Sequence, residues 1–180
     1  MAVWIYTWIR RGTLGAESAP PYLLQQGALV LMAVLGAVGA FASVVPGAPS
    51  RAGVGLLLAL VMMMAALMWG TSLDLRQFGT AGIGREADWP CVVSITLGAV
   101  MLWMFAVALL RRGAVLDPRT TSVLAGVAAL STANIEACVS RIHAFTGTII
   151  LWHGTTAAIV LLGLTMFGPR LLGRRRGLAS

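Results

Sequence analysis

The sequence predicts an all-α fold, a polytopic transmembrane bundle of five helices, or six if the opening residues belong to a further span. Its composition carries this prediction: 58% of the 180 residues are hydrophobic, only 11% are charged, and the mean hydropathy is +0.87. A soluble domain carries about 25% charged residues and cannot bury so much apolar surface at this size. The distribution of apolar residues along the chain supplies the second observation.

Five stretches are long and apolar enough to span a membrane. A helix needs about 20 mostly apolar residues to cross a hydrocarbon core of about 30 Å. Because lipid offers the backbone no hydrogen bonds, each stretch is expected to be a helix, and the alternating segments of a β-barrel strand are absent from the sequence. The predicted spans are Tyr22–Val45, Ala52–Trp69, Cys91–Leu110, Thr120–Val139 and Phe145–Phe167.

The spans divide the chain into an aromatic N-terminal segment (1–21), a helix bundle (22–169) and a basic tail (170–180). The second span is the shortest. Gly70–Pro90 has mixed charges and several glycines, and is predicted to be a solvated loop that has room for a short helix on the membrane. Gly168-Pro169 is expected to end the last span, since proline breaks helices.

The arginines predict the orientation. All thirteen basic residues are Arg and the net charge is +7. They flank apolar stretches, so anionic lipid explains them and no nucleic-acid partner is expected. Arginine excess marks the cytoplasmic side, which predicts a cytoplasmic C-terminus and an outer N-terminus. Five arginines fall on the outer side, and the other eight on the cytoplasmic side are Arg51, Arg111, Arg112, Arg119, Arg170, Arg174, Arg175 and Arg176.

Both termini are predicted contact surfaces for lipid or for a protein. The first nine residues are apolar and aromatic but too short to span, and aromatic rings favour the membrane interface. Three readings stay open for this segment: a helix lying flat on the membrane, a peg that docks on another protein, or the remnant of a further span. The residues expected to make these contacts are Trp4, Tyr6, Trp8, Arg170, Arg174, Arg175 and Arg176.

The two cysteines, Cys91 and Cys138, stand at the start of the third span and at the end of the fourth. Successive spans run in opposite directions, so both thiols are expected at the outer face, where an oxidising compartment permits a sensing pair or a disulfide. The alternative is two buried, inert thiols. With His143 they form a candidate soft-metal site that lacks a fourth ligand.

Three polar residues lie within predicted spans: Asn134, Glu136 and His153. Such groups are costly in lipid and usually face the bundle interior. Asn134 is expected to bond across helices, Glu136 to reach water or pair with Arg141, and His153 to lie hydrogen-bonded between helices. Gly36 and Ala40, four residues apart, predict a close helix contact.

The chain contains no nucleophile–base pair, phosphate loop or paired carboxylates on which catalysis could rest. The sequence therefore predicts a non-catalytic protein that needs no cofactor.

The second half of the chain resembles the NrsF-type anti-sigma factors, small multi-span proteins of the bacterial inner membrane. The resemblance begins at Trp89-Pro90-Cys91, which opens a span. The motifs that follow in order are Arg111-Arg112-Gly113-Ala114, Asp117-Pro118-Arg119, Leu124-Ala125-Gly126-Val127-Ala128-Ala129, Cys138, Leu151-Trp152-His153 and Gly168-Pro169-Arg170-Leu171-Leu172.

This resemblance implies a regulator in the bacterial inner membrane that holds an extracytoplasmic-function sigma factor. The family's two characteristic cysteines would be Cys91 and Cys138, and their reaction with a heavy metal or an oxidant would release the sigma factor. The usual six spans and the cytoplasmic N-terminal segment of the family are not evident in this sequence. An alternative function is therefore a structural accessory subunit of a larger respiratory or photosynthetic membrane complex.

Overall fold

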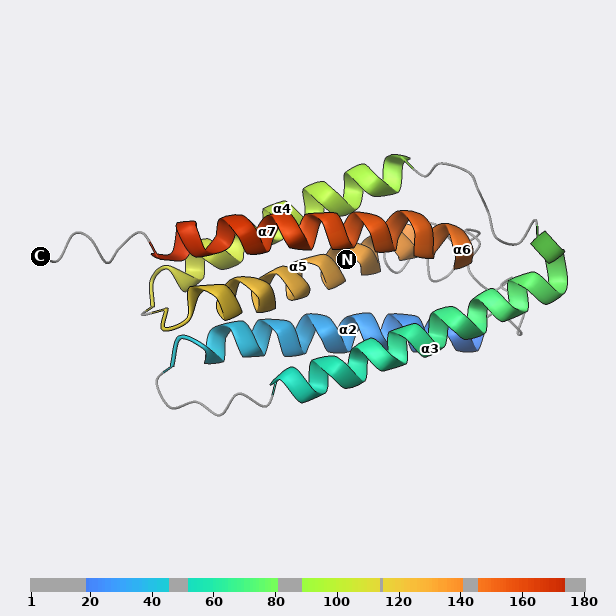
Figure 1. Ribbon diagram of the computed structural model, residues 1–180, viewed down its shortest axis with the longest axis horizontal. Coiled ribbons are helices and arrows are strands. Elements are labelled where there is room, and N and C mark those ends of the chain that lie inside the picture. Colours follow the sequence, from blue (N-terminus) through green and yellow to red (C-terminus); the bar gives the residue numbers. More distant parts are fainter. Residues whose placement is uncertain (1–18, 46–51, 81–88, 114, 141–145, 174–180) are drawn as a thin grey trace, which may run out of the picture.

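The computed structural model describes residues 19–45, 52–80, 89–113, 115–140 and 146–173, which form a bundle of long, roughly antiparallel helices (Figure 1). Five helices are long and apolar enough to cross a membrane, and the described residues contain no strand, so the predicted fold class is confirmed. In chain order the elements are α2 (Ala19–Ala42), α3 (Ala52–Phe78), α4 (Trp89–Leu110), α5 (Pro118–Ser140), α6 (Thr146–Thr148), the π-helix η2 (Ile149–Gly154) and α7 (Thr155–Gly173).

Helix α5 is the centre of the bundle. It packs against α2, α4 and α7, and 67% of its spanning window is buried, against 17–33% for the other spans. Its sequence is rich in Ala, Gly, Ser and Thr, small residues that let neighbouring backbones approach closely where lipid supplies no hydrophobic driving force. Many large apolar side chains of α3 and α4, among them Leu57, Met68 and Phe105, are exposed instead, as expected where a helix faces lipid.

Two glycines make the closest contacts with α5. A Cβ atom on Gly36 of α2 would lie 2.9 Å from the backbone of α5 at Leu124 and Ala128, and Ala40, one turn further, is buried. The predicted contact at Gly36 and Ala40 is therefore confirmed. On α7, a Cβ atom on Gly168 would overlap the side chain of Ser122.

Helix α3 is longer than predicted. Its 27 residues make it the longest described helix, so the expectations of a short second span and of a loop from Gly70 are wrong. The hydroxyls of Thr71 and Ser72 bond back to carbonyls of the preceding turn, and no residue in this stretch breaks the helix. Gly79, with a φ of 59°, has the left-handed conformation that ends helices.

Helix α7 also passes the predicted stop, since it continues through Pro169 to Gly173. The expected end of the last span at Gly168-Pro169 is wrong because, within a membrane, neighbouring helices can satisfy the backbone groups that a proline disturbs. The Ser122 hydroxyl of α5 donates to the Leu164 carbonyl, 3.1 Å away, next to the Thr165 carbonyl that loses its helical donor because proline has no N–H. Arg170, the first residue of the predicted tail, lies exposed on this helix.

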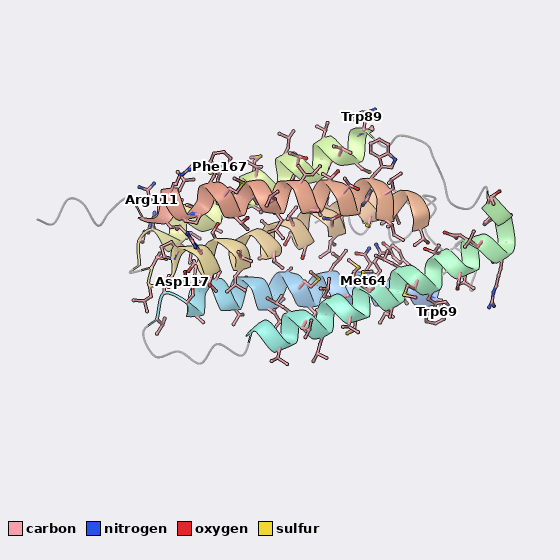
Figure 2. The ribbon with its side chains drawn as sticks, in the orientation of Figure 1. Met64, Trp69, Trp89, Arg111, Asp117 and Phe167 are labelled. Atoms are coloured by element: carbon pink, nitrogen blue, oxygen red, sulfur yellow. The ribbon has the colours of Figure 1, made fainter. Side chains whose placement is uncertain are left out.

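A polar network ties α2 to α5 at the end of the bundle where α7 finishes. The Ser43 and Thr121 hydroxyls lie 2.6 Å apart. Asp117 caps α5 by accepting the backbone N–H groups of Arg119 and Thr120, and hydrogen bonds, first from the Thr120 side chain, lower the pKa of Asp117. Figure 2 shows Asp117 and Arg111 at this end, and Trp89 and Trp69 toward the other. We call these the arginine end and the cysteine end.

Candidate functional site

Both cysteines lie at the cysteine end of the bundle. Cys91 is in the first turn of α4 and Cys138 in the last turn of α5, and these neighbouring helices run in opposite directions (Figure 1). Each side chain is 3% exposed, and neither cysteine forms a disulfide within the described residues. The antiparallel order of the spans thus places two residues that are 47 positions apart in the sequence at the same end of the bundle.

The thiol of Cys138 meets polar groups from two other elements. The amide Nε2 of Gln25, on α2, donates to the sulfur across 3.5 Å, and Nδ1 of His153, in η2, lies 3.7 Å from the same sulfur. All three side chains are buried. One sulfur atom therefore links α2, α5 and η2, and His153 lies between helices as predicted.

A π-helical segment positions the histidine. η2 spans Ile149–Gly154 and continues directly into α7. Within it His153 is buried while its neighbour Gly154 is exposed. Wider π-helical turns of this kind interrupt α-helices rarely and are frequent at functional sites.

Cys91 lies in an apolar environment next to this polar contact. It belongs to a buried cluster with Ile95 and Ala99 of its own helix and with Leu130, Ala133 and Ala137 of α5. Ala137 immediately precedes Cys138. Just outside the cluster, the rings of Trp89 and Trp152 are tilted by 56° with their centroids 5.6 Å apart. The segments Trp89-Pro90-Cys91 and Leu151-Trp152-His153 therefore lie side by side.

Asn134 and Glu136, the other two polar residues predicted within spans, have different environments on α5. Asn134 is buried, but its Nδ2 donates to the Leu130 carbonyl of its own helix at 2.9 Å, so the expected bond across helices is not formed by this donor. Glu136 is exposed, and Arg141, its expected partner, lies outside the described residues. Asn134 also lines a groove bordered by α3 and α7.

Gln25 is the residue of this site that the sequence analysis missed. A lone amide pair, Gln25-Gln26, interrupts the apolar stretch of α2 near its start, and a polar group in a span usually faces the bundle interior. That signal predicts a buried contact for Gln25, but it does not identify Cys138, 113 residues away, as the partner.

Several predicted site residues have no described position. These are Trp4, Tyr6, Trp8, His143, Arg174, Arg175 and Arg176. Among the described residues, no group of three or more His, Cys, Asp or Glu side chains is placed to hold a metal ion. The soft-metal site of Cys91, Cys138 and His143 therefore stays a prediction, as do the contacts of the two termini.

The reactive group at this site is a thiol with two polar neighbours. A sulfur next to an amide donor and an imidazole can bind a soft metal or react with an oxidant as its thiolate. Because the sulfur is enclosed, any group added to it must displace Gln25 or His153.

Comparison with known proteins agrees with a regulatory role. The sequence pattern of one family, described as "NrsF: Negative regulator of sigma F", matches residues 1–173. The match begins at residue 1, so the predicted limit of the likeness to the second half is wrong. Searches of curated proteins and of solved structures found no match. The chain belongs to the NrsF family of negative regulators of sigma factors, and it is a multi-pass member with five candidate membrane spans.

Proposed function

We propose that this protein holds an extracytoplasmic-function sigma factor against the cytoplasmic face of the bacterial inner membrane and releases it when Cys91 or Cys138 reacts. The family supports a sigma-factor partner and a non-catalytic regulatory role. In this proposal the arginine end is cytoplasmic, since it carries exposed Arg111, Arg112, Arg119 and Arg170, and arginine excess marks that side.

The observation that carries the sensing step is the contact of Cys138 with Gln25 and His153. A cadmium ion that binds the sulfur replaces the thiol proton and needs space that the packed site does not have. Gln25 lies on α2 and His153 lies in η2, which continues into α7, so displacing either side chain is expected to shift α2 or α7 relative to α5. Such a shift reaches the arginine end, where α2 and α5 meet at Ser43 and Thr121.

The two ends of the chain have separate roles in this proposal. The segment 1–21, with its aromatic residues, lies at the membrane interface, and the basic tail 170–180 contributes to the surface that meets the sigma factor. An accessory subunit of a respiratory or photosynthetic complex would instead use both ends to contact other membrane subunits.

Membrane fractionation tests the proposal. The tagged protein is expressed together with the sigma factor encoded in the same genome. We expect the sigma factor in the membrane fraction, and we expect it to elute with the tagged protein after gentle solubilisation. Cadmium is expected to move most of it to the soluble fraction. Cys91→Ser with Cys138→Ser is expected to keep it at the membrane under cadmium, because the sulfur ligands are gone.

Ser94→Ala, which changes an exposed polar residue of α4, is the control and should release the sigma factor like the wild type. If the tagged protein elutes with a stoichiometric set of membrane subunits and without the sigma factor, the proposed capture of the sigma factor is contradicted. Equal release from the double cysteine variant contradicts the sensing step alone.

A further inference from the structure

A groove opens between α3 and α7 near the cysteine end. Helix α3 packs along α2 and meets α6, whereas α7 packs along α5 and α4. The two outer helices diverge and leave a cavity of about 680 Å³, within the range of about 300–1,000 Å³ typical of small-molecule sites. α2 and α5 form its floor.

The buried polar groups of the groove lie toward the cysteine end, among apolar lining residues. Its buried polar lining residues are each at most 8% exposed and lie on the parts of α2, α5 and η2 nearest the cysteine end: Gln25, Ser131, Asn134 and His153. Toward the middle of the bundle the lining is apolar, with Met32, Leu60, Val127 and Leu161. This gradient fits an amphiphile whose head lies near the cysteine end and whose tail points to the membrane centre.

The lining also limits the head group. The described residues that line it include no Arg, Lys, Asp or Glu, so a charged phosphate head would lose its hydration without gaining a counter-charge from them. The nitrogen of Asn134 uses one of its two hydrogens on the Leu130 carbonyl, and the second can donate to a ligand. The Ser131 hydroxyl is a further donor. These groups suit a neutral head that carries carbonyl oxygens.

The two walls of the groove differ in shape. The α3 wall carries Met63, Met64 and Met68, whose polarizable sulfurs make favourable contacts with ring edges and faces; Figure 2 shows Met64 on this helix. The opposite wall has a run of small residues, Gly154, Ala157 and Ala158, between the larger Ile150 and Leu161. Flexible thioethers that face these small residues leave a space suited to a flat ring.

We propose that the groove between α3 and α7 binds a quinone-class lipid, with the ring carbonyls at Asn134 and Ser131 and the apolar tail along Leu60 and Leu161. Because Gln25 and His153 line the groove and also contact Cys138, an occupied groove adjoins the thiol site. The proposal does not depend on sigma-factor capture.

Quenching of tryptophan fluorescence by decylubiquinone tests it, with the purified protein in phosphatidylcholine nanodiscs. Gly154→Leu adds an isobutyl group at this wall, and its Cβ atom meets nothing within 4 Å, so the helix backbone need not move to accept it. We expect the Kd of Gly154→Leu and of Asn134→Leu to rise about tenfold. Gly163→Leu, also on α7 and equally free of neighbours but outside the groove, should bind like the wild type.

Dioleoylglycerol, a neutral lipid without a ring, should not displace decylubiquinone at equal concentration. Unchanged quenching in Gly154→Leu, or displacement by dioleoylglycerol, overturns the proposal. Membrane fractionation of the sigma factor is a separate readout, so failure of one proposal leaves the other intact.

Discussion

Gly36→Ala is expected to lower the free energy of unfolding by about 2–3 kcal/mol, the upper part of the range for overpacked cores. A Cβ atom at this position would lie 2.9 Å from both the Ala128 nitrogen and the Leu124 oxygen. Both are backbone atoms of α5, which cannot rotate away as a side chain can, so α2 must separate from the central helix. Reversible unfolding in mixed detergent micelles, followed by circular dichroism, measures the change.

Gly27→Ala is the matched control on the same helix. A Cβ atom there meets nothing within 4 Å, and alanine favours the helix by about 0.5–1 kcal/mol over glycine, so this variant should be at least as stable as the wild type. Adding Ala128→Gly to Gly36→Ala should not restore stability, because the clash is with backbone. Full rescue by Ala128→Gly would contradict this account.

Gly168→Ala is expected to cost about 2 kcal/mol by the same overpacking, at the contact between α5 and α7. The added methyl group would overlap the Ser122 side chain and approach the Trp103 ring at 3.0 Å. It would also disturb the bond from the Ser122 hydroxyl to the Leu164 carbonyl, next to the turn that Pro169 weakens. The same unfolding assay measures the loss.

Here the obstacle is a side chain, so a second substitution should relieve it. Ser122→Gly combined with Gly168→Ala is expected to recover part of the stability that Gly168→Ala loses, although the bond to Leu164 is gone. Gly163→Ala, in the same helix with no neighbour within 4 Å, should not destabilise the protein. Equal loss in the Gly163 and Gly168 variants would show that the contact with α5 is not the cause.

The number of spans was predictable because hydropathy measures the property that a bilayer selects. The helix ends were not, because a helix does not stop where lipid stops. α3 continues past Trp69 through Thr71 and Ser72, whose hydroxyls bond to its own backbone. α7 continues past Pro169 beside a serine of another helix. Local hydrogen bonds of this kind do not appear in a hydropathy pattern.

The place of the candidate site in the bundle was partly predictable from the order of the spans. Alternating span directions put Cys91 and Cys138 at one end of the bundle without any knowledge of packing. The partners of Cys138 required the rotation and depth of each helix, which the weakly amphipathic α2 and α5 do not reveal. Gln25 and His153 meet the sulfur from helices distant in sequence, and only the packed structure identifies them.

The extent of the family likeness was underestimated because the first two described helices consist mainly of Ala, Gly, Leu, Val and Met. Such a composition satisfies any membrane span and offers few distinctive positions. Both cysteines and both histidines come after Trp89, so the distinctive motifs of the resemblance lie in the second half of the chain.

The central claim is that the arginine end faces the cytoplasm and the cysteine end faces outward. Labelling of intact spheroplasts with a membrane-impermeant maleimide tests it most directly, with Cys91 and Cys138 replaced by Ser and one cysteine introduced at an exposed position. We expect Thr80→Cys, just after α3, to be labelled at once, and Leu116→Cys, just before α5, to be labelled only after lysis. Protection of Thr80→Cys together with labelling of Leu116→Cys would contradict the claim.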